Sequence, residues 1–436
     1  MHRDVSDVVV VGAGVIGCSI AYELARTGHS VVVVDKGLAA GAGSTSSSSA
    51  IVRFHYSTLD GVTAAWEAKH LWERWEDFLG GTDESGLARL HRTGVVVIDP
   101  PGLGRKERVL SLFDKVGVPY ADLSADDLAA RFPALDTGRY WPPRAVDDDR
   151  FWSDPSGRVD AYFTPDAGFV DDPQLAAHNL MVAAARHGAT FRFRAAVVGV
   201  SVSGGRVDGV RLGDGSVLSC GVVVNAAGPF SSRLNDLAGV ADEFQTISTR
   251  ALRQEVHTVP APRGFGLDDG GTIVNDGDLG TYFRPQPGGT IVIGGLEPDC
   301  DALIWVPDAD DYDPNPTVAG WEAQTYRTAR RLPDLTVPNR PVGLGALYDV
   351  TPDWIPVYDR TSLGGFYVAI GTSGNQFKNS PVVGRFLRAL IEACESGHDH
   401  DRTPVRYECE VTGNHVDLGH YSRLRPLADT TMNVLG

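Results

Sequence analysis

Three glycines near the start of the chain, Gly12, Gly14 and Gly17, have the spacing of a loop that binds a dinucleotide pyrophosphate. Gly12 permits a tight turn, Gly14 lets the backbone approach the pyrophosphate, and Gly17 lets a helix pack closely on the sheet. Asp35 follows at close to the roughly 20 residues expected for a carboxylate that binds the ribose. A carboxylate at this place favours an unphosphorylated ribose, so the pattern predicts FAD or NAD.

The elements around these residues support that interpretation. Residues 8–11 and 31–34 are continuous runs of valine, which are typical of strands buried on both faces of a parallel sheet. Between them, apolar side chains at helical spacing predict a helix over residues 16–26. The N–H groups and the dipole at the start of this helix would point at the pyrophosphate.

Two later segments repeat the pattern of a buried strand that ends in small residues. They are CGVVVNAAGP at 220–229 and GGFYVAIGTSG at 364–374. Between them, residues 250–296 alternate with Gly/Pro turns and predict an antiparallel sheet. Nucleotide-type segments therefore stand at the start, middle and end of the chain. A simple dehydrogenase would instead keep its nucleotide domain in one or two contiguous pieces.

Helical and extended patterns fill most of the remaining chain. Helices are expected over 59–79, 103–116, 125–132, 174–187 and 379–395, and short strands over 95–98, 190–194, 197–202 and 207–212. Residues 137–162 are irregular and predict a loop or an insertion. The tail is polar and is also expected to be irregular.

Composition excludes several classes of function. The chain has 436 residues and a net charge of −17 without any basic block, which argues against a nucleic-acid partner. Its five cysteines are scattered without a CxxC pair, so we expect reduced thiols and no metal site. No apolar run approaches the roughly 18 residues that a membrane span needs, and the first residues lack a signal-peptide pattern. We therefore expect a cytoplasmic protein of about two domains with no membrane partner.

The order of these segments resembles the FAD-dependent D-amino acid oxidase superfamily, most closely its sarcosine oxidase and dimethylglycine dehydrogenase branch. The resemblance spans roughly residues 5–400. It rests on GAGVIG with Asp35, FTPDAGFVDDP at 163–173, VVVNAAGPFS at 222–231 and GFYVAIGTSGNQFKNSPVVGRFL at 365–387. The last segment is similar to the superfamily's Gly-x-Ser-Gly-x-Gly-Phe-Lys motif, which is much more specific than a glycine loop.

The resemblance implies an α/β fold in which a Rossmann-type FAD-binding domain is interleaved with a β-rich (α+β) substrate-binding domain. The expected FAD-binding domain comprises residues 1–80, 163–245 and 335–400. The expected substrate domain comprises residues 81–162 and 246–334, and residues 401–436 form a C-terminal tail.

The resemblance also implies the residues that meet the substrate. Arg53 matches the arginine that binds the substrate carboxylate in sarcosine oxidases, and Lys378 matches the lysine that shares this task. A guanidinium forms a bidentate fork with a carboxylate, while an ammonium adds a compact charge. Tyr282 matches a frequent active-site tyrosine, and His55 is a candidate to face the flavin; a plain strand tyrosine and a packed histidine are the alternatives. Arg284 is expected at the surface rather than as a second anion anchor.

The implied cofactor site extends well beyond Gly12, Gly14, Gly17 and Asp35. The turn at 371–376 leads into a helix and would point backbone N–H groups at the N1–C2=O edge of the flavin. There the groups would stabilise the negative charge of reduced flavin. The further candidate FAD-binding residues are Ser44, Thr45, Val197, Ala227, Gly228, Gly371, Gly374, Asn375, Gln376 and Lys378.

Three departures from the superfamily pattern bear on the chemistry. Ala346 stands where sarcosine oxidases carry the cysteine that tethers FAD. Ser46 and Ser47 stand where the related dehydrogenases carry a linking histidine, so FAD is expected to bind without a covalent link. Val292 stands where sarcosine oxidases carry an oxygen-activating lysine. The reaction with oxygen is therefore expected to be slow, and the electron acceptor is oxygen or another molecule.

The resulting hypothesis is an FAD-dependent oxidoreductase that acts on an amino acid or an N-alkylamino acid. It would oxidise the C–N bond by hydride transfer to flavin N5, giving an imine that hydrolyses. Two alternatives stay open at this point. One is a 2-hydroxy acid dehydrogenase of the same fold, and the other is a flavin-bearing subunit of a larger oxidase complex.

Overall fold

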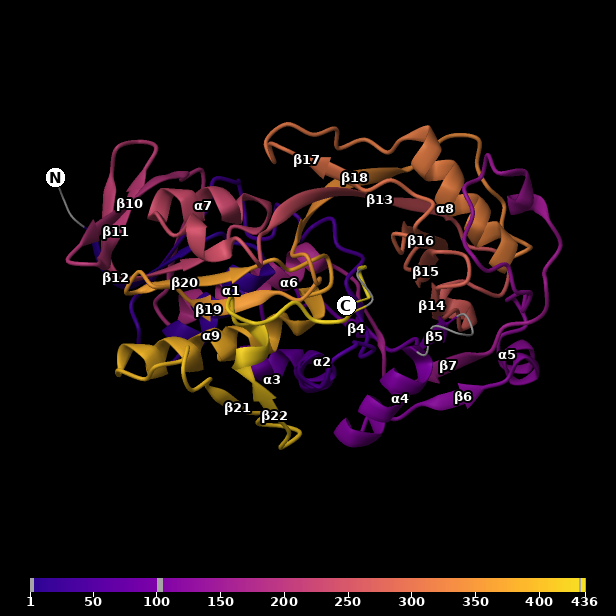
Figure 1. Ribbon diagram of the computed structural model, residues 1–436, viewed down its shortest axis with the longest axis horizontal. Helices are drawn as coiled ribbons and strands as arrows, with labels where there is room; N and C mark the ends of the chain where they lie inside the picture. Colours follow the sequence, from indigo (N-terminus) through magenta and orange to yellow (C-terminus); the bar gives the residue numbers. More distant parts are fainter. Residues whose placement is uncertain (1–3, 100–104, 431–432, 436) are drawn as a thin grey trace.

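The computed structural model describes residues 4–99, 105–430 and 433–435. Two large sheets form two lobes that lie side by side (Figure 1). Strands from the beginning, the middle and the last third of the chain build each sheet, so the chain passes between the lobes several times. The mixed α/β architecture with interleaved segments is therefore confirmed.

The first sheet has the order β10-β11-β12-β1-β2-β9, and β20 joins it beside β12 and carries β19. β12, β1, β2, β9 and β20 run parallel, as in a nucleotide-binding α/β sheet. The two valine runs are central strands with buried side chains, because parallel strands are covered on both faces. The bounds are β1 Asp4–Val11, β2 Val31–Val34, β9 Thr190–Arg192, β10 Val197–Ser203, β11 Arg206–Leu212, β12 Val217–Asn225, β19 Val357–Arg360 and β20 Phe366–Ile370.

The second sheet has the order β17-β13-β16-β15-β14-β5-β7-β6, with β18 paired to β13. Its strands pair antiparallel except for β5 and β14. The bounds are β5 Val95–Ile98, β6 Ala121–Leu123, β7 Ala161–Thr164, β13 Arg250–Pro260, β14 Ile273–Asp276, β15 Thr281–Gln286, β16 Thr290–Gly295, β17 Ile304–Val306 and β18 Gly343–Val350. Small sheets are formed by β3 Ile51–Val52, β8 Gly168–Val170 and β4 Leu90–His91, and by β21 Arg406–Glu408 and β22 His415–Asp417.

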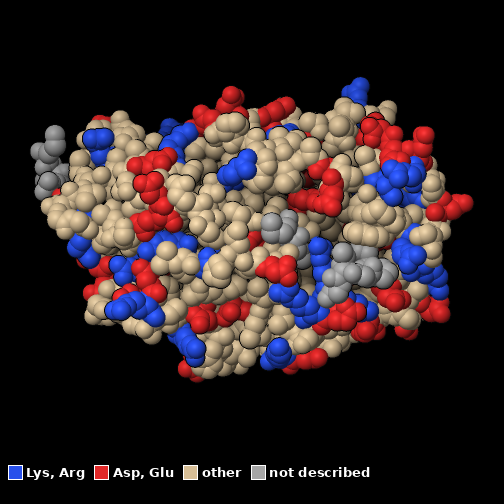
Figure 2. All heavy atoms as spheres, in the orientation of Figure 1, with Lys and Arg blue, Asp and Glu red and all other residues tan. Residues whose placement is uncertain are grey.

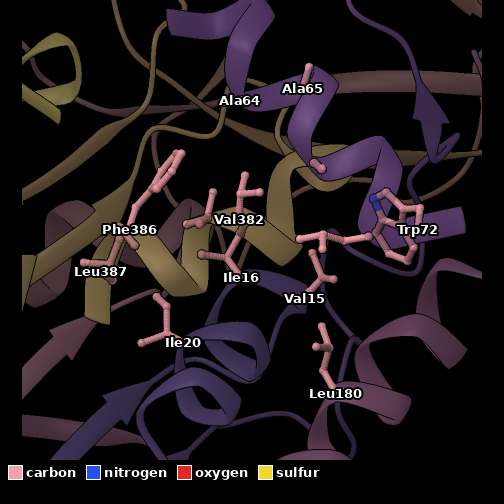
Figure 3. Close-up of a cluster of buried hydrophobic side chains, with 14 of the residues drawn as sticks. Val15, Ile16, Ile20, Ala64, Ala65, Trp72, Leu180, Val382, Phe386 and Leu387 are labelled. Atoms are coloured by element: carbon pink, nitrogen blue, oxygen red, sulfur yellow. The ribbon is translucent and has the colours of Figure 1, made fainter. Parts of the chain in front are cut away.

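Helices cover the first sheet and bury its apolar side chains. Val15, Ile16 and Ile20 of α1 face Val382 and Phe386 of α9 in the main core cluster (Figure 3). Because α1 is buried along its whole length, it holds the glycine loop at its start rigidly against the sheet. The helices are α1 Val15–Ala25, α2 Leu59–Glu73, α3 Trp75–Leu79, α4 Arg105–Val116, α5 Ala125–Arg131, α6 Pro173–Arg186, α7 Ser231–Ala238, α8 Val318–Arg331 and α9 Ser380–Glu395.

Three expectations differ from the structure. The single helix expected over 59–79 is broken at Arg74, whose backbone (φ −116°, ψ 45°) leaves the helical region between α2 and α3. β18 was expected with the FAD-binding segment 335–400 but belongs to the second sheet, because it pairs along its length with β13. The tail is not irregular throughout, because β21 and β22 pair with each other. The first residues of the helix expected at 103–116 lie outside the described residues.

Acidic and basic side chains are interspersed over the face seen in Figure 2. Mixed charge of this kind is consistent with the absence of a basic block in the sequence. Among the described residues, no helix is both long enough and apolar enough to cross a membrane.

Candidate active site

A cavity of about 650 Å³ lies where the two sheets meet. Its walls come from the ends of β1, β2 and β12 in the first sheet and from β13, β15 and β18 in the second. Its volume falls in the range of pockets that hold small molecules and cofactors. The glycine loop and the turn after β20 both line the cavity, so one large ligand can contact both.

The glycine loop forms the first end of the cavity. Gly12 has φ +112°, and a Cβ at this position would stand 2.2 Å from the Ala226 carbonyl oxygen, so only glycine fits. Asp35 Oδ2 accepts a hydrogen bond from the Ala13 N–H at 2.6 Å. Thr45 Oγ1 accepts one from the Val15 N–H at 3.1 Å. Backbone without side chains, at the start of a helix, is what a dinucleotide pyrophosphate requires.

The turn after β20 forms the other end. Gly374 has φ +67°, and a Cβ there would stand 2.4 Å from the Tyr348 ring. Ser373 is left-handed as well, with φ 47°, although it is not glycine. Strained backbone of this kind persists where the surrounding structure fixes it, and it concentrates at functional sites. The turn is therefore fixed beside the cavity, and the N–H groups of Gly371, Ser373 and Asn375 already donate to Asp349 and Thr372.

Arg53 and Lys378 both line the cavity, and both lie close to the Tyr56 ring. The Arg53 guanidinium carbon lies 5.1 Å from the ring centroid, and Lys378 Nζ lies 5.0 Å from it. The Tyr56 hydroxyl donates to the Asn375 carbonyl at 2.7 Å, and Lys378 Nζ donates to the same oxygen at 2.5 Å. The aromatic ring thus lies within the range of a cation–π interaction with both cations.

Both cations are buried. Arg53 is 5% exposed and Lys378 is 3% exposed. Burial lowers the pKa of Arg53, and burial together with the Arg53 charge lowers the pKa of Lys378 well below its ordinary value. All the hydrogen bonds of the two groups, in the described part of the chain, go to backbone carbonyls. Because a carbonyl carries only a partial charge, the pair retains a strong preference for an anion.

Tyr282 lines the cavity, whereas His55 does not. The Tyr282 hydroxyl is hydrogen-bonded to Ser49 Oγ at 2.6 Å. His55 Nε2 lies 2.8 Å from Asn275 Nδ2, and Asn275 lines the cavity in its place. Burial and the neighbouring cations lower the pKa of His55 well below its ordinary value, so the ring is neutral and its Nε2 accepts the Asn275 hydrogen bond. His55 therefore orients the Asn275 amide.

The structure brings together most of the residues expected from the sequence. The candidates that line the cavity are Gly12, Gly14, Asp35, Ser44, Thr45, Arg53, Val197, Ala227, Gly228, Tyr282, Gly374, Asn375, Gln376 and Lys378. Gly17, His55 and Gly371 lie outside the wall. Gly17 lies inside α1, and Gly371 follows β20 directly.

Arg284 does not lie at the surface, so that expectation was wrong. Its side chain is buried, with its guanidinium carbon 4.2 Å from the Phe169 ring centroid. Nε donates to the Ser49 carbonyl at 2.8 Å. Arg284 and Tyr282 share one face of β15, because side chains alternate along a strand, and that face is turned toward the interior. Through this hydrogen bond Arg284 holds the segment that precedes Arg53, and Arg284 itself does not line the cavity.

Several residues of the cavity wall were missed. The amide of Asn275 and the ring of Tyr348 both line the cavity, and so do Val434 and Leu435 from the tail. Tyr348 lies in the segment that matches the flavin-tethering region of sarcosine oxidases, so this match could have predicted that Tyr348 lines the cavity. Nothing in the local sequence of Asn275 or of the tail indicates a position at the site.

Comparison with known proteins agrees with this geometry. The chain is 24% identical over 404 residues to glycine oxidase from Geobacillus kaustophilus, covering 90% of this chain and 94% of that protein. It is 29% identical over 451 residues to D-amino acid dehydrogenase from Cereibacter sphaeroides, covering 88% and 91%. The crystal structure of L-proline dehydrogenase from P. horikoshii superposes with a TM-score of 0.73 at 24% identity, covering 91% of this chain and 95% of that one. The sequence model of FAD dependent oxidoreductases matches residues 7–390, and the chain therefore belongs to this family, the D-amino acid oxidase superfamily of FAD-dependent enzymes.

Proposed function

We propose that this FAD-dependent oxidoreductase oxidises the C–N bond of an α-amino acid or an N-alkylamino acid. The observation that carries the proposal is the convergence of Arg53 and Lys378, both buried, on one wall of the cofactor cavity. Burying two cations is costly unless an anion compensates them. A substrate carboxylate supplies that anion, and the guanidinium offers it a planar, bidentate fork.

The relatives support the amino-acid class of substrate. The names of the similar proteins include a glycine oxidase, a D-amino acid dehydrogenase and an L-proline dehydrogenase. Those three proteins act on amino acids that differ in side chain, in configuration and in amine substitution. The part of the substrate that they share is the amine next to a carboxylate, which is the part that Arg53 and Lys378 would hold.

The residues of the cavity fit FAD. Gly12, Gly14 and Asp35 would hold the pyrophosphate and the ribose, and the turn around Gly374 would face the flavin. When bound, FAD supplies the acceptor for the hydride that leaves the substrate. The side chains of this chain bind the carboxylate, exclude water and orient the amine. The oxidised product is an imine, which takes up water and releases the amine as a separate molecule or as ammonia.

Anaerobic bleaching of the flavin tests the proposed function. The holoenzyme is mixed without oxygen with glycine, sarcosine, L-proline, and D- and L-valine, and with the corresponding 2-hydroxy acids. We expect loss of the visible flavin absorbance, which accompanies flavin reduction, with at least one amine. Bleaching by hydroxy acids alone selects the hydroxy-acid alternative, and bleaching by no compound contradicts an enzymatic role of the isolated chain.

FAD is expected to be released by acid precipitation. Ala346 lines the cavity at the position where related oxidases carry the linking cysteine, and an alanine methyl group forms no covalent bond to a flavin. Ser46 and Ser47 replace the linking histidine of related dehydrogenases. After precipitation with trichloroacetic acid, the yellow colour should appear in the supernatant. Flavin that stays with the washed pellet would show that another residue forms the link.

A further inference from the structure

The tail segment Asn433–Leu435 enters the cavity between the two lobes. Figure 1 shows the C-terminal part of the chain running to the middle of the molecule, and Val434 and Leu435 line the cavity there. Val434 is held at both ends of its backbone. Its N–H donates to Glu297 Oε2 at 3.0 Å, and its carbonyl accepts from Arg53 Nη2 at 2.5 Å. The Leu435 carbonyl accepts from Arg53 Nη1 at 2.9 Å.

This arrangement has the pattern of a bound amino acid. The nitrogen and the carbonyl oxygen of one residue are joined through N–Cα–C, as are the amine and the carboxylate of a free α-amino acid. Arg53 therefore meets the acceptor end of Val434, and Glu297 meets its donor end. We propose that Val434 stands in the substrate position, and that Glu297 binds the substrate amine while Arg53 binds its carboxylate. This inference rests on the proposed function, because it assigns the amine side of the same site.

Glu297 has capacity left for such a ligand. Its Oε1 is buried and has no hydrogen-bond partner in the described part of the chain. A buried acceptor without a partner is costly, so a site that leaves one open is suited to a ligand that brings donors. An ammonium has more N–H groups than the single amide N–H of Val434. The backbone of Glu297 is left-handed, with φ 48°, which is strained for a glutamate and fixes its position after β16.

The side chain of Val434 indicates the class of substrate. Val434 is 8% exposed and packs in an apolar cluster with Leu252, Tyr282, Leu296, Val350 and Trp354. A ligand that takes the place of Val434 would put its own side chain into this cluster. Burial of apolar area there contributes roughly 25 cal/mol per Å², whereas a charged side chain would lose its hydration. The site therefore selects an α-amino acid with an aliphatic side chain of about the size of valine.

The substrate and the tail segment exclude each other in this arrangement. Both require the guanidinium of Arg53 and the carboxylate of Glu297. The segment must therefore move out when substrate binds. Only the molecules in which the segment has left the cavity can bind substrate, so the apparent affinity for substrate is the intrinsic affinity multiplied by their fraction. Shortening the segment has the opposite effect from damaging a binding residue.

The protonation of Glu297 should make the binding of an amine depend on pH. A purely structural residue would not give this dependence. Burial raises the pKa of Glu297 to about 8 and Asp301 raises it further, against the opposing effects of the Val434 N–H hydrogen bond and of the Arg53 charge. Tyr282 and Tyr348 are the other titratable groups that interact with it. Below pH 8 the carboxyl is protonated in the free protein, so an ammonium ligand must displace that proton. Affinity for the amine then rises with pH up to about 8 and levels off above it.

A matched pair of ligands tests the assignment. Valine, as both enantiomers, is compared with 3-methylbutanoate, which has the same carboxylate and side chain but no amine. Binding to the holoenzyme is measured without oxygen by the flavin spectral shift and by calorimetry. Where valine reduces the flavin, the dissociation constant comes from the concentration dependence of the reduction rate. Glu297→Gln keeps an acceptor for Val434 but removes the charge, and Asp299→Asn removes a charge from an exposed residue of the same loop.

The Glu297→Gln protein should bind one valine enantiomer about tenfold more weakly or worse, while its affinity for 3-methylbutanoate stays within about twofold. The ratio of the two affinities should rise between pH 6 and 8 in wild type and in Asp299→Asn, and be flat in Glu297→Gln. Using the ratio cancels any titration that acts on the carboxylate. An unchanged ratio, an equal loss of both ligands, or a wild-type protein that binds neither ligand overturns the assignment of Glu297.

Removing residues 433–436 tests the competition. The truncated holoenzyme should bind 3-methylbutanoate at least tenfold more tightly than the full chain, with unchanged flavin content. Val434→Pro removes the N–H that donates to Glu297 and also replaces the side chain by a ring with a fixed φ. This variant should shift the affinity in the same direction, and it serves if the truncated chain does not fold. Unchanged or weaker binding in the folded variants shows that the segment is a fixed wall. Flavin bleaching of the wild type by amino acids is scored separately, so the proposed function can hold while this inference fails.

Discussion

Replacing Arg53 with lysine is expected to weaken substrate binding, or slow flavin reduction, by about 10- to 150-fold despite the conserved charge. This range corresponds to about 1.5–3 kcal/mol for a hydrogen bond to a charged group. The guanidinium now forms three hydrogen bonds, to the carbonyls of His55, Val434 and Leu435, from a fixed planar fork. A lysine ammonium does not reproduce that fork, so a carboxylate would lose its bidentate contact.

Lys378→Met should reduce the affinity for the carboxylate as well, because it removes the second cation. Methionine is chosen because its side chain has nearly the length of lysine. Rapid anaerobic mixing gives the dissociation constant and the limiting rate for each variant. Flavin content and melting temperature are measured alongside, and Arg206→Lys, an exposed arginine on β11, is the matched control. If both site variants reduce their flavin like wild type at every substrate concentration, the carboxylate is held elsewhere.

The parts of the site that are local in sequence were predictable. Only glycine fits at position 12, because a Cβ there would stand 2.2 Å from the Ala226 carbonyl oxygen. Asp35 accepts a hydrogen bond from the Ala13 N–H of the same loop. A strand, a tight turn and a helix place these residues within one βαβ unit, so their spacing carries the geometry. The two valine runs were likewise readable as buried parallel strands, because no polar position interrupts them.

The parts that depend on long-range contacts were not predictable from one sequence. Val434 reaches Glu297 across 137 residues of sequence separation and Arg53 across 381. No local sequence pattern around Glu297 or Arg53 predicts its contact with Val434. Arg284 reads as a surface residue because arginine is usually exposed, yet the register of β15 turns it inward onto the Phe169 ring. Local pattern thus specifies the part of the cavity around the glycine loop, and tertiary packing brings Asn275 and Val434 into the rest of its wall.

Replacing Asp35 with alanine is expected to weaken FAD retention by about 10- to 150-fold, corresponding to about 1.5–3 kcal/mol. The carboxylate is the proposed acceptor for the ribose, and it also holds the glycine loop. Oδ2 accepts from the Ala13 N–H and Oδ1 from the Gly37 N–H, each at 2.6 Å. Alanine removes all of these contacts at once. Asp35→Asn retains a neutral acceptor of the same size and should lose less.

The ratio of flavin to protein absorbance after dialysis, and titration of the apoprotein with FAD, measure the effect. Asp208→Ala, which removes an exposed carboxylate from β11, should keep its flavin. Full flavin occupancy of Asp35→Ala after dialysis would refute the ribose role. Asparagine keeps one acceptor oxygen, so it can accept from only one of the two N–H groups and turns its NH2 toward the other. If asparagine retains FAD nearly as well as aspartate, FAD retention needs neither the negative charge nor the second loop hydrogen bond. If asparagine loses FAD almost as alanine does, FAD retention needs the full carboxylate, with its charge and both acceptor oxygens.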